Sequence, residues 1–403
     1  MARSEQAHSA QDRSVLVLAM GASICSGCAH LGSSIMPFQI DALMTGLHQS
    51  ASLAGVFGFF EIFSFALFML LLSRVFLALP VMYSALSGMA LGVVACLLLY
   101  IGPGVEVWIC SVAVLLGLSA ALLCRSYVRA VSSSLNPERI YAIASGGGLV
   151  IIVSVIALVP VSTRYFGPLG VFLAVACIML LAMPSVLSFR HVHACRPVTR
   201  QQKGGPLLTG GAIALLCVWV GCSLGSSMAW SFAERMGRNL GLSPDFIVSL
   251  STVGIVTSVL ASLVGAALAH RWRRETVLLL TLLGTGAGCL LTCVAWDALS
   301  YGAGVVLYWN CAMLSYAWLL GSAATLDGSG RVGTFCGGMD RMGYALGAPL
   351  GGLLVDHTSF TVLGICGFLM CVAPLPFALP VLFRALHKST MAPTEHEAHL
   401  EMV

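Results

Sequence analysis

The chain has 403 residues, of which 58% are hydrophobic and 9% are charged. Soluble domains carry about 25% charged residues, so this composition cannot cover a water-exposed surface. The apolar residues fall in runs of about 20, which is the length of a helix that crosses a bilayer. A soluble fold is therefore excluded, and the modest net charge of +4 does not suggest a nucleic-acid partner.

Twelve transmembrane helices are predicted, so the expected fold class is an all-α membrane protein. A polar tail (1–13) precedes an N-terminal six-helix bundle (14–189) with spans near 14–38, 52–72, 80–101, 108–128, 142–161 and 168–187. A polar linker (190–206) leads to a C-terminal six-helix bundle (207–382) with spans near 207–230, 246–269, 276–295, 299–319, 332–354 and 360–379. Residues 383–403 are expected to form a second polar tail.

The distribution of cationic residues predicts the orientation. If the N-terminus is cytoplasmic, only Arg164, Arg235 and Arg238 face outside, while Arg125 and Arg341 fall within spans. The other fifteen of the 20 Lys and Arg residues then lie inside, as the positive-inside rule requires. An even number of spans places both termini in the cytoplasm, and a bacterial inner membrane is the expected location.

The two halves share short sequence patterns. The first span reads Leu-Gly-Ser-Ser at 31–34, and the seventh reads the same at 224–227. Arg139 followed by Ser-Gly-Gly at 145–147 matches Arg331 followed by Cys-Gly-Gly at 336–338. Six spans separate the copies, so the two bundles are parallel repeats about a pseudo-two-fold axis along the membrane normal. Such repeats place the substrate site near the midplane, between the halves.

This arrangement resembles the major facilitator superfamily over nearly the whole chain. Residues 265–274 are similar to the family's basic loop motif, with His270 where Asp is usual and Arg273 where Gly is usual. Residues 136–139 resemble the family's loop after the fourth span, and residues 343–352 resemble a Gly/Pro packing motif. The resemblance implies a secondary transporter with a small-molecule substrate.

Two departures from the family pattern narrow this expectation. The fifth span has glycine at 146–148 but no Gly-Pro pair, so the pattern of drug–proton antiporters is missing there. The fourth span lacks an arginine near its outer half. The sequence contains no nucleotide-binding motif, and its 15 cysteines lack metal-ligand spacing. No cofactor or metal is therefore expected, and an ion gradient or the solute's own gradient would drive transport.

Three charged residues are predicted in the middle third of the membrane: Glu61 in the second span, and Asp340 and Arg341 in the eleventh. A charge at the bilayer centre costs at least about 3 kcal/mol, so such residues are functional by default. The resemblance implies that these two spans face each other. Glu61 and Arg341 are therefore expected within ion-pair reach in at least one conformation. Either the three residues couple transport to protons, or they form a static network that locks the halves.

Polar residues of spans one, four, seven and ten are candidates for binding the substrate, because the resemblance implies that these spans line the cavity. Arg125 could attract an anionic substrate or only snorkel to the cytoplasmic interface. His30 could contact substrate or relay protons, although a single helix histidine is more often a packing residue. The rest of the expected mixed aromatic and hydrogen-bonding pocket consists of Ser34, Ser227, Trp230, Trp309 and Asn310.

The sequence thus predicts a secondary active transporter, not an enzyme, that moves a small organic solute by alternating access. An organic anion or amphipathic metabolite is favoured as substrate, proton coupling and a functional monomer are expected, and the direction is open. The alternative is a transporter-like membrane sensor or scaffold without transport activity, because a fold does not fix a function.

Overall fold

The computed structural model describes residues 17–75, 80–132, 137–190, 208–268, 273–327 and 331–391. Over these ranges the chain is almost entirely helical and contains no strand, as the all-α prediction requires. Ten of the described helices are long and apolar enough to cross a membrane. The two remaining predicted spans are a broken first segment and a helix rich in glycine and charge, residues 331–357.

The N-terminal half begins with the helical residues Val17–Ala29. It continues as α2 (Leu31–Ser34), α3 (Met36–Gly46), α4 (Ala51–Val75), α5 (Val81–Ile101), α6 (Glu106–Ser132), α7 (Pro137–Phe166), α8 (Gly170–Ala182) and the 3₁₀ helix η1 (Met183–Phe189). The predicted tail 1–13 and nearly all of the predicted linker 190–206 lie outside the described residues.

The C-terminal half consists of α9 (Gly210–Trp230), α10 (Ala233–Asn239), α11 (Pro244–Leu268), α12 (Arg274–Cys293), α13 (Ala298–Leu326), α14 (Arg331–His357), α15 (Phe360–Val372) and α16 (Leu375–Met391). The last predicted span is divided at residues 373–374. Helix α16 then continues through Met391, past residue 382, where the C-terminal bundle was expected to end.

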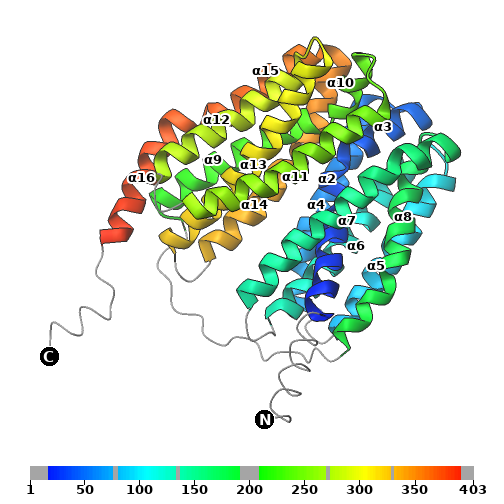
Figure 1. Cartoon of the computed structure of the whole chain (residues 1–403), viewed down its shortest axis with the longest axis horizontal. Coiled ribbons are helices and arrows are strands. Elements are labelled where there is room, and N and C mark those ends of the chain that lie inside the picture. The colour runs from blue at the N-terminus through cyan, green and yellow to red at the C-terminus, as the bar shows by residue number, and fades with distance from the viewer. Residues whose placement is uncertain are drawn as a thin grey trace.

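The leading span of each half is broken near one end. His30 (φ −104°, ψ 6°) and Ile35 (φ −102°, ψ 9°) leave the α-helical region, and Pro37 suits the first turn of α3 because it has no N–H to satisfy. In the C-terminal half, Phe232 (φ −111°, ψ 9°) separates α9 from α10. Helices α3 and α10 lie at the same end of the molecule, which we call the tip end (Figure 1). The opposite end, where the first and last helices of the described chain begin and end, is called the terminal end.

The two halves are joined mainly by α4 with α14, α7 with α11, and α3 with α10. Toward the tip end, α4 and α14 touch backbone to backbone, because a Cβ at Gly55 would meet the Ala348 carbonyl and one at Gly352 would meet the Ala51 carbonyl. This confirms the close helix approach predicted for glycines in 343–352. Farther along α14 toward the terminal end, a Cβ at Gly338 would have no neighbour within 4 Å.

The apolar cores also differ between the two ends of the molecule. One core contains the interior of the N-terminal half together with part of the C-terminal half, including Phe57, Phe172, Phe232, Met236 and Ile247. The second core belongs to the C-terminal half alone and includes Trp219, Leu278, Leu319, Cys336 and Leu382. Because only the first core contains residues from both halves, the halves pack as one body at the tip end.

Candidate functional site

Glu61 is held within the N-terminal half, against the broken first segment. Its side chain on α4 is buried, and a Cβ at Gly32 would touch its carboxylate. With its amide nitrogen facing these acceptors, Gln39 of α3 donates to Glu61 Oε2 at 3.3 Å and to the Gly32 carbonyl at 3.2 Å. A neutral amide is thus the partner of this buried acid.

Asp340 and Arg341 form a pair within the C-terminal half. Asp340 is buried on α14 and accepts a hydrogen bond from the Ser223 hydroxyl of α9. Arg341 Nε lies 3.4 Å from Asp340 Oδ2, and the arginine side chain is 26% exposed. The described ion pairs do not join Glu61 to Arg341 in this conformation. The expectation that these two residues meet in some conformation therefore stays a prediction.

A tyrosine joins the two halves beside these charges. Tyr344 of α14 donates its hydroxyl to the Ser33 carbonyl of α2 at 3.1 Å, across the boundary between the halves. It lies one helical turn beyond Asp340 and Arg341. We call Ser33, Glu61, Asp340, Arg341 and Tyr344 the seam. Sequence reasoning missed Tyr344, although its spacing from the buried charges could have indicated it.

His30 packs among aromatic side chains of its own half. Its Nδ1 lies 2.8 Å from the Ser26 carbonyl, which requires a proton on Nδ1 and leaves Nε2 as the acceptor in the neutral ring. The ring meets Phe65 edge-on at 6.2 Å between centroids and lies 6.4 Å from Tyr127. Ser34 lies next along the broken segment and is half-buried.

Arg125 points toward a neighbouring helix of the same half. It is buried on α6, and its Nη1 donates to the Ser84 hydroxyl of α5 at 3.3 Å. Ser84 is itself fully buried, so this contact lies in the interior of the bundle.

The predicted pocket residues of the C-terminal half lie in three separate places. Trp230 stacks on Tyr308 at 5.3 Å and meets Trp309 edge-on at 5.1 Å, so the two predicted tryptophans do come together. Ser227 is fully buried and donates to the Tyr344 carbonyl at 2.6 Å, between α9 and α14. Asn310 turns toward α11, where its amide donates to Thr257 Oγ1 at 2.8 Å.

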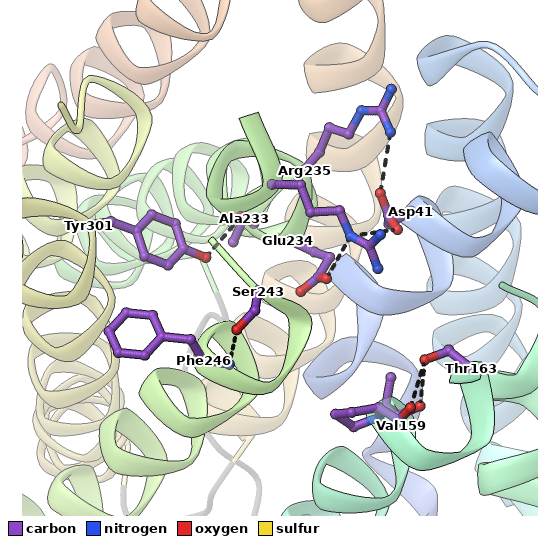
Figure 2. A network of polar contacts seen from close by, with 11 residues as sticks. Asp41, Val159, Thr163, Ala233, Glu234, Arg235, Ser243, Phe246 and Tyr301 are labelled. Carbon is purple, nitrogen blue, oxygen red and sulfur yellow. Dashed lines mark hydrogen bonds and ion pairs between the residues drawn. The ribbon is translucent and has the colours of Figure 1, made fainter. Parts of the chain in front are cut away.

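The three arginines expected outside lie together at the tip end, and all three pair with the opposite half. Arg235 of α10 approaches Asp41 of α3, with Nη1 to Oδ1 at 3.5 Å (Figure 2). Arg238 Nε of the same helix lies 3.2 Å from Asp41 Oδ2. Arg164 of α7 pairs with Asp245 of α11 at 3.6 Å. Asp41 falls between the predicted first and second spans, and its role as the shared partner was not predicted from the sequence.

A helix cap adds a further contact between the halves. Asp356, near the end of α14, accepts hydrogen bonds from Ala51 N at 3.1 Å and Ser52 N at 2.7 Å, at the start of α4. Partial burial would raise the pKa of Asp356, but the hydrogen bonds from Ser52 and Ala51 outweigh it and lower the pKa below its ordinary value. The carboxylate therefore stabilises the positive end of α4 from the other half.

The described residues include no group of three or more His, Cys, Asp or Glu side chains that could hold a metal ion. A shallow cavity of about 320 Å³ lies at the tip end between α7 and α11, lined by Pro160, Thr163, Arg164, Pro168, Arg238, Pro244 and Asp245. It belongs to the ion-paired surface and not to the seam.

Comparisons with known proteins agree with this geometry. Residues 215–401 match the family model described as Major Facilitator Superfamily. The crystal structure of the peptide transporter POT in complex with sulfate is similar over 92% of this chain and 95% of that one, with a TM-score of 0.69 and 13% identity. The nucleoside transporter NupG is similar over 93% of this chain and 100% of that one, with a TM-score of 0.64 and 13% identity.

A search of curated proteins finds no match. Both solved structures are named as transporters. Residues 215–401 thus match the Major Facilitator Superfamily, and the described chain has the fold of the two solved transporters.

Proposed function

We propose that this protein is a secondary active transporter that carries a small organic solute between its two halves by alternating access, coupled to protons. In this proposal the tip end faces the outside of a bacterial inner membrane and both termini lie in the cytoplasm. The packed tip end then corresponds to a state that is closed on the outside. The protein would act as a monomer.

The main support for the proposal is that each buried charge of the seam is paired within its own half. Glu61 is satisfied by Gln39 within one half, and Asp340 by Ser223 and Arg341 within the other. The Tyr344 hydrogen bond crosses between the halves, and it involves neutral groups. The halves can therefore separate here without breaking a buried ion pair, which would cost about 3–5 kcal/mol.

Each seam acid is suited to exchange a proton as its surroundings change. A carboxylate in the membrane interior is costly, and it becomes easier to ionise when the halves rock and water reaches it. Gln39 can hydrogen-bond to Glu61, and Ser223 to Asp340, whether the acid is protonated or ionised. This is because an amide and a hydroxyl can both donate and accept. We assign proton coupling to Glu61 and to the Asp340–Arg341 pair on this basis.

The chemistry near the seam favours an organic anion or an amphipathic metabolite. Arg341 is partly exposed, and a guanidinium binds carboxylate and phosphate groups in two-pronged geometry. His30 and Ser34, on the broken segment beside Ser33, would supply neutral hydrogen-bonding groups. The similar structures carry nucleosides and peptides by name, so both classes belong among the candidate solutes.

The direct test is solute uptake into proteoliposomes with and without an imposed pH gradient, screened across organic acids, nucleosides, short peptides and amphipathic drugs. We expect at least one solute to accumulate only with the gradient, and Glu61→Gln to abolish that dependence. Glu106→Gln is the matched control, because Glu106 is exposed at the start of α6. A solute that binds but never crosses, under either condition, would instead support the sensor alternative.

A further inference from the structure

We propose that Asp41 and Glu234 form a proton-binding site that exists only while the two halves are packed together at the tip end. The ligand is a proton taken from water, shared by two carboxyl groups that compete for one arginine. This site lies apart from the seam and does not depend on which solute is carried.

The geometry brings two buried acids to one cation. Arg238 Nε lies 2.9 Å from Glu234 Oε1 and 3.2 Å from Asp41 Oδ2. The Asp41 and Glu234 side chains are 5% and 2% exposed, whereas those of Arg235 and Arg238 are 38% and 35% exposed. Figure 2 shows Asp41, Glu234 and Arg235 converging between α3 and α10. The two acids are therefore shielded from water, whereas the two arginines are partly exposed to it.

Each of the two acids has one carboxylate oxygen that lacks a hydrogen-bond partner among the described residues. Glu234 Oε2 has no hydrogen-bond partner among the described residues, and Asp41 Oδ1 has only the ion-pair approach of Arg235 Nη1 at 3.5 Å. An unsatisfied buried carboxylate oxygen is costly, and a proton on one acid removes a charge from water-free surroundings. Two carboxyl groups at one site commonly hold one proton between them for this reason.

Among the residues that the structure describes, no further cation lies within ion-pair distance of the two acids. Thr45 lies on α3 near Asp41, and Tyr301 of α13 donates its hydroxyl to the Ala233 carbonyl beside Glu234. Asp245, on the neighbouring helix α11, pairs with Arg164. Burial raises the pKa of Asp41, although Arg238 and Arg235 beside it act in the opposite direction.

The site depends on packing at the tip end because its members come from opposite halves. When α3 and α10 separate, water reaches both acids, and each regains the ordinary proton affinity of a free carboxyl group. Since the packed state binds the proton more tightly, acid must favour the packed state. An ion-pair latch without a bound proton predicts the reverse, because protonation would remove the attraction between Asp41 and the arginines.

Hydrogen exchange of the full chain in lipid nanodiscs distinguishes the shared-proton site from an ion-pair latch without a bound proton. After correction for intrinsic rates, amides of α3 and α10 should exchange more slowly at about pH 5.5 than at about pH 8. The slowing approaches about tenfold for each unit by which packing raises the proton affinity only as the pH falls to the ordinary carboxyl pKa of about 4. Glu234→Gln mimics the protonated acid and should be slow at both values. Asp41→Asn loses the pairs between the halves and should be fast at both.

Asp245→Asn is the matched control, since it removes an exposed pair between the halves and leaves the two buried acids in place. It should keep the full response to pH. Faster exchange of α3 and α10 in acid, or an unchanged pH response in both Glu234→Gln and Asp41→Asn, would overturn the proposal. Neither result would bear on solute transport itself.

Discussion

Charged residues are paired between the halves at the tip end but within each half at the seam. At the tip end, Asp41 and Asp245 pair with arginines of the other half. At the seam, Asp340 pairs with the next residue of its own helix, and Glu61 with an amide of its own half. Charge therefore holds the halves together where water can solvate the separated partners. At the seam, charged groups are paired within each half, because separating a pair there would leave an unpaired charge in the membrane.

Breaking the seam pair should have the largest effect. Arg341→Gln leaves Asp340 buried without its counter-charge, so we expect a loss of about 3–5 kcal/mol in the free energy of unfolding. Thermal unfolding in detergent measures it. The double variant Asp340→Asn with Arg341→Gln should recover most of the loss, because no uncompensated charge remains. Equal losses in the single and double variants would show that the pair is not coupled.

Backbone contact at the tip end gives the next largest effect. Gly352→Ala places a Cβ against the Ala51 carbonyl, and overpacking of this kind costs about 1–3 kcal/mol. We expect faster hydrogen exchange at the start of α4 and the end of α14. Gly338→Ala is the control on the same helix, because its Cβ would have no neighbour within 4 Å, and it should leave exchange there unchanged.

The helix cap contributes less and depends on pH in a defined direction. Asp356→Ala removes the acceptor for Ala51 N and Ser52 N, and we expect a cost of about 0.5–2 kcal/mol. Because packing lowers the pKa of Asp356, its stabilisation is complete above the ordinary carboxyl pKa and is lost as pH falls through the lowered value. The difference in melting between wild type and variant should stay constant from neutral pH to about pH 5. A difference that shrinks near neutral pH would contradict this assignment.

The smallest effect should come from the neutral hydrogen bond that crosses the seam. Tyr344→Phe removes the donor to the Ser33 carbonyl, and one such bond contributes about 0.5–1.5 kcal/mol. The variant should unfold slightly more easily, as measured in denaturant, and should open more readily at the tip end. Tyr83→Phe is the control, because Tyr83 is exposed on α5 and should leave stability unchanged.

Much of the fold could be predicted because it follows from composition and periodicity. Apolar runs gave the spans, and the count of cations on each side grouped Arg164, Arg235 and Arg238, which do lie at one end. The matching Leu-Gly-Ser-Ser segments indicated the repeat. The breaks at His30 and Ile35 were missed because neither residue is a helix breaker, and only Pro37 marks where the helix restarts.

The site was harder to predict because side-chain partners depend on contacts between distant helices. Nothing local indicates that Asn310 turns to Thr257, or that Arg125 reaches Ser84. Asp340 and Arg341 are neighbours on a helix and leave it about 100° apart, so a pair between them was not expected. The buried charges themselves were found, because a charge in an apolar span is rare enough to be informative.

Alternating access requires the halves to open at the tip end as they close at the terminal end. The direct measurement is a pair of spin-label distances in the full chain, one between α7 and α11 at the tip end and one between their opposite ends, with labels on genetically encoded non-cysteine sites. Compared with wild type, Gly352→Ala should lengthen the first distance and shorten the second. A longer tip-end distance with no change at the terminal end would contradict alternating access.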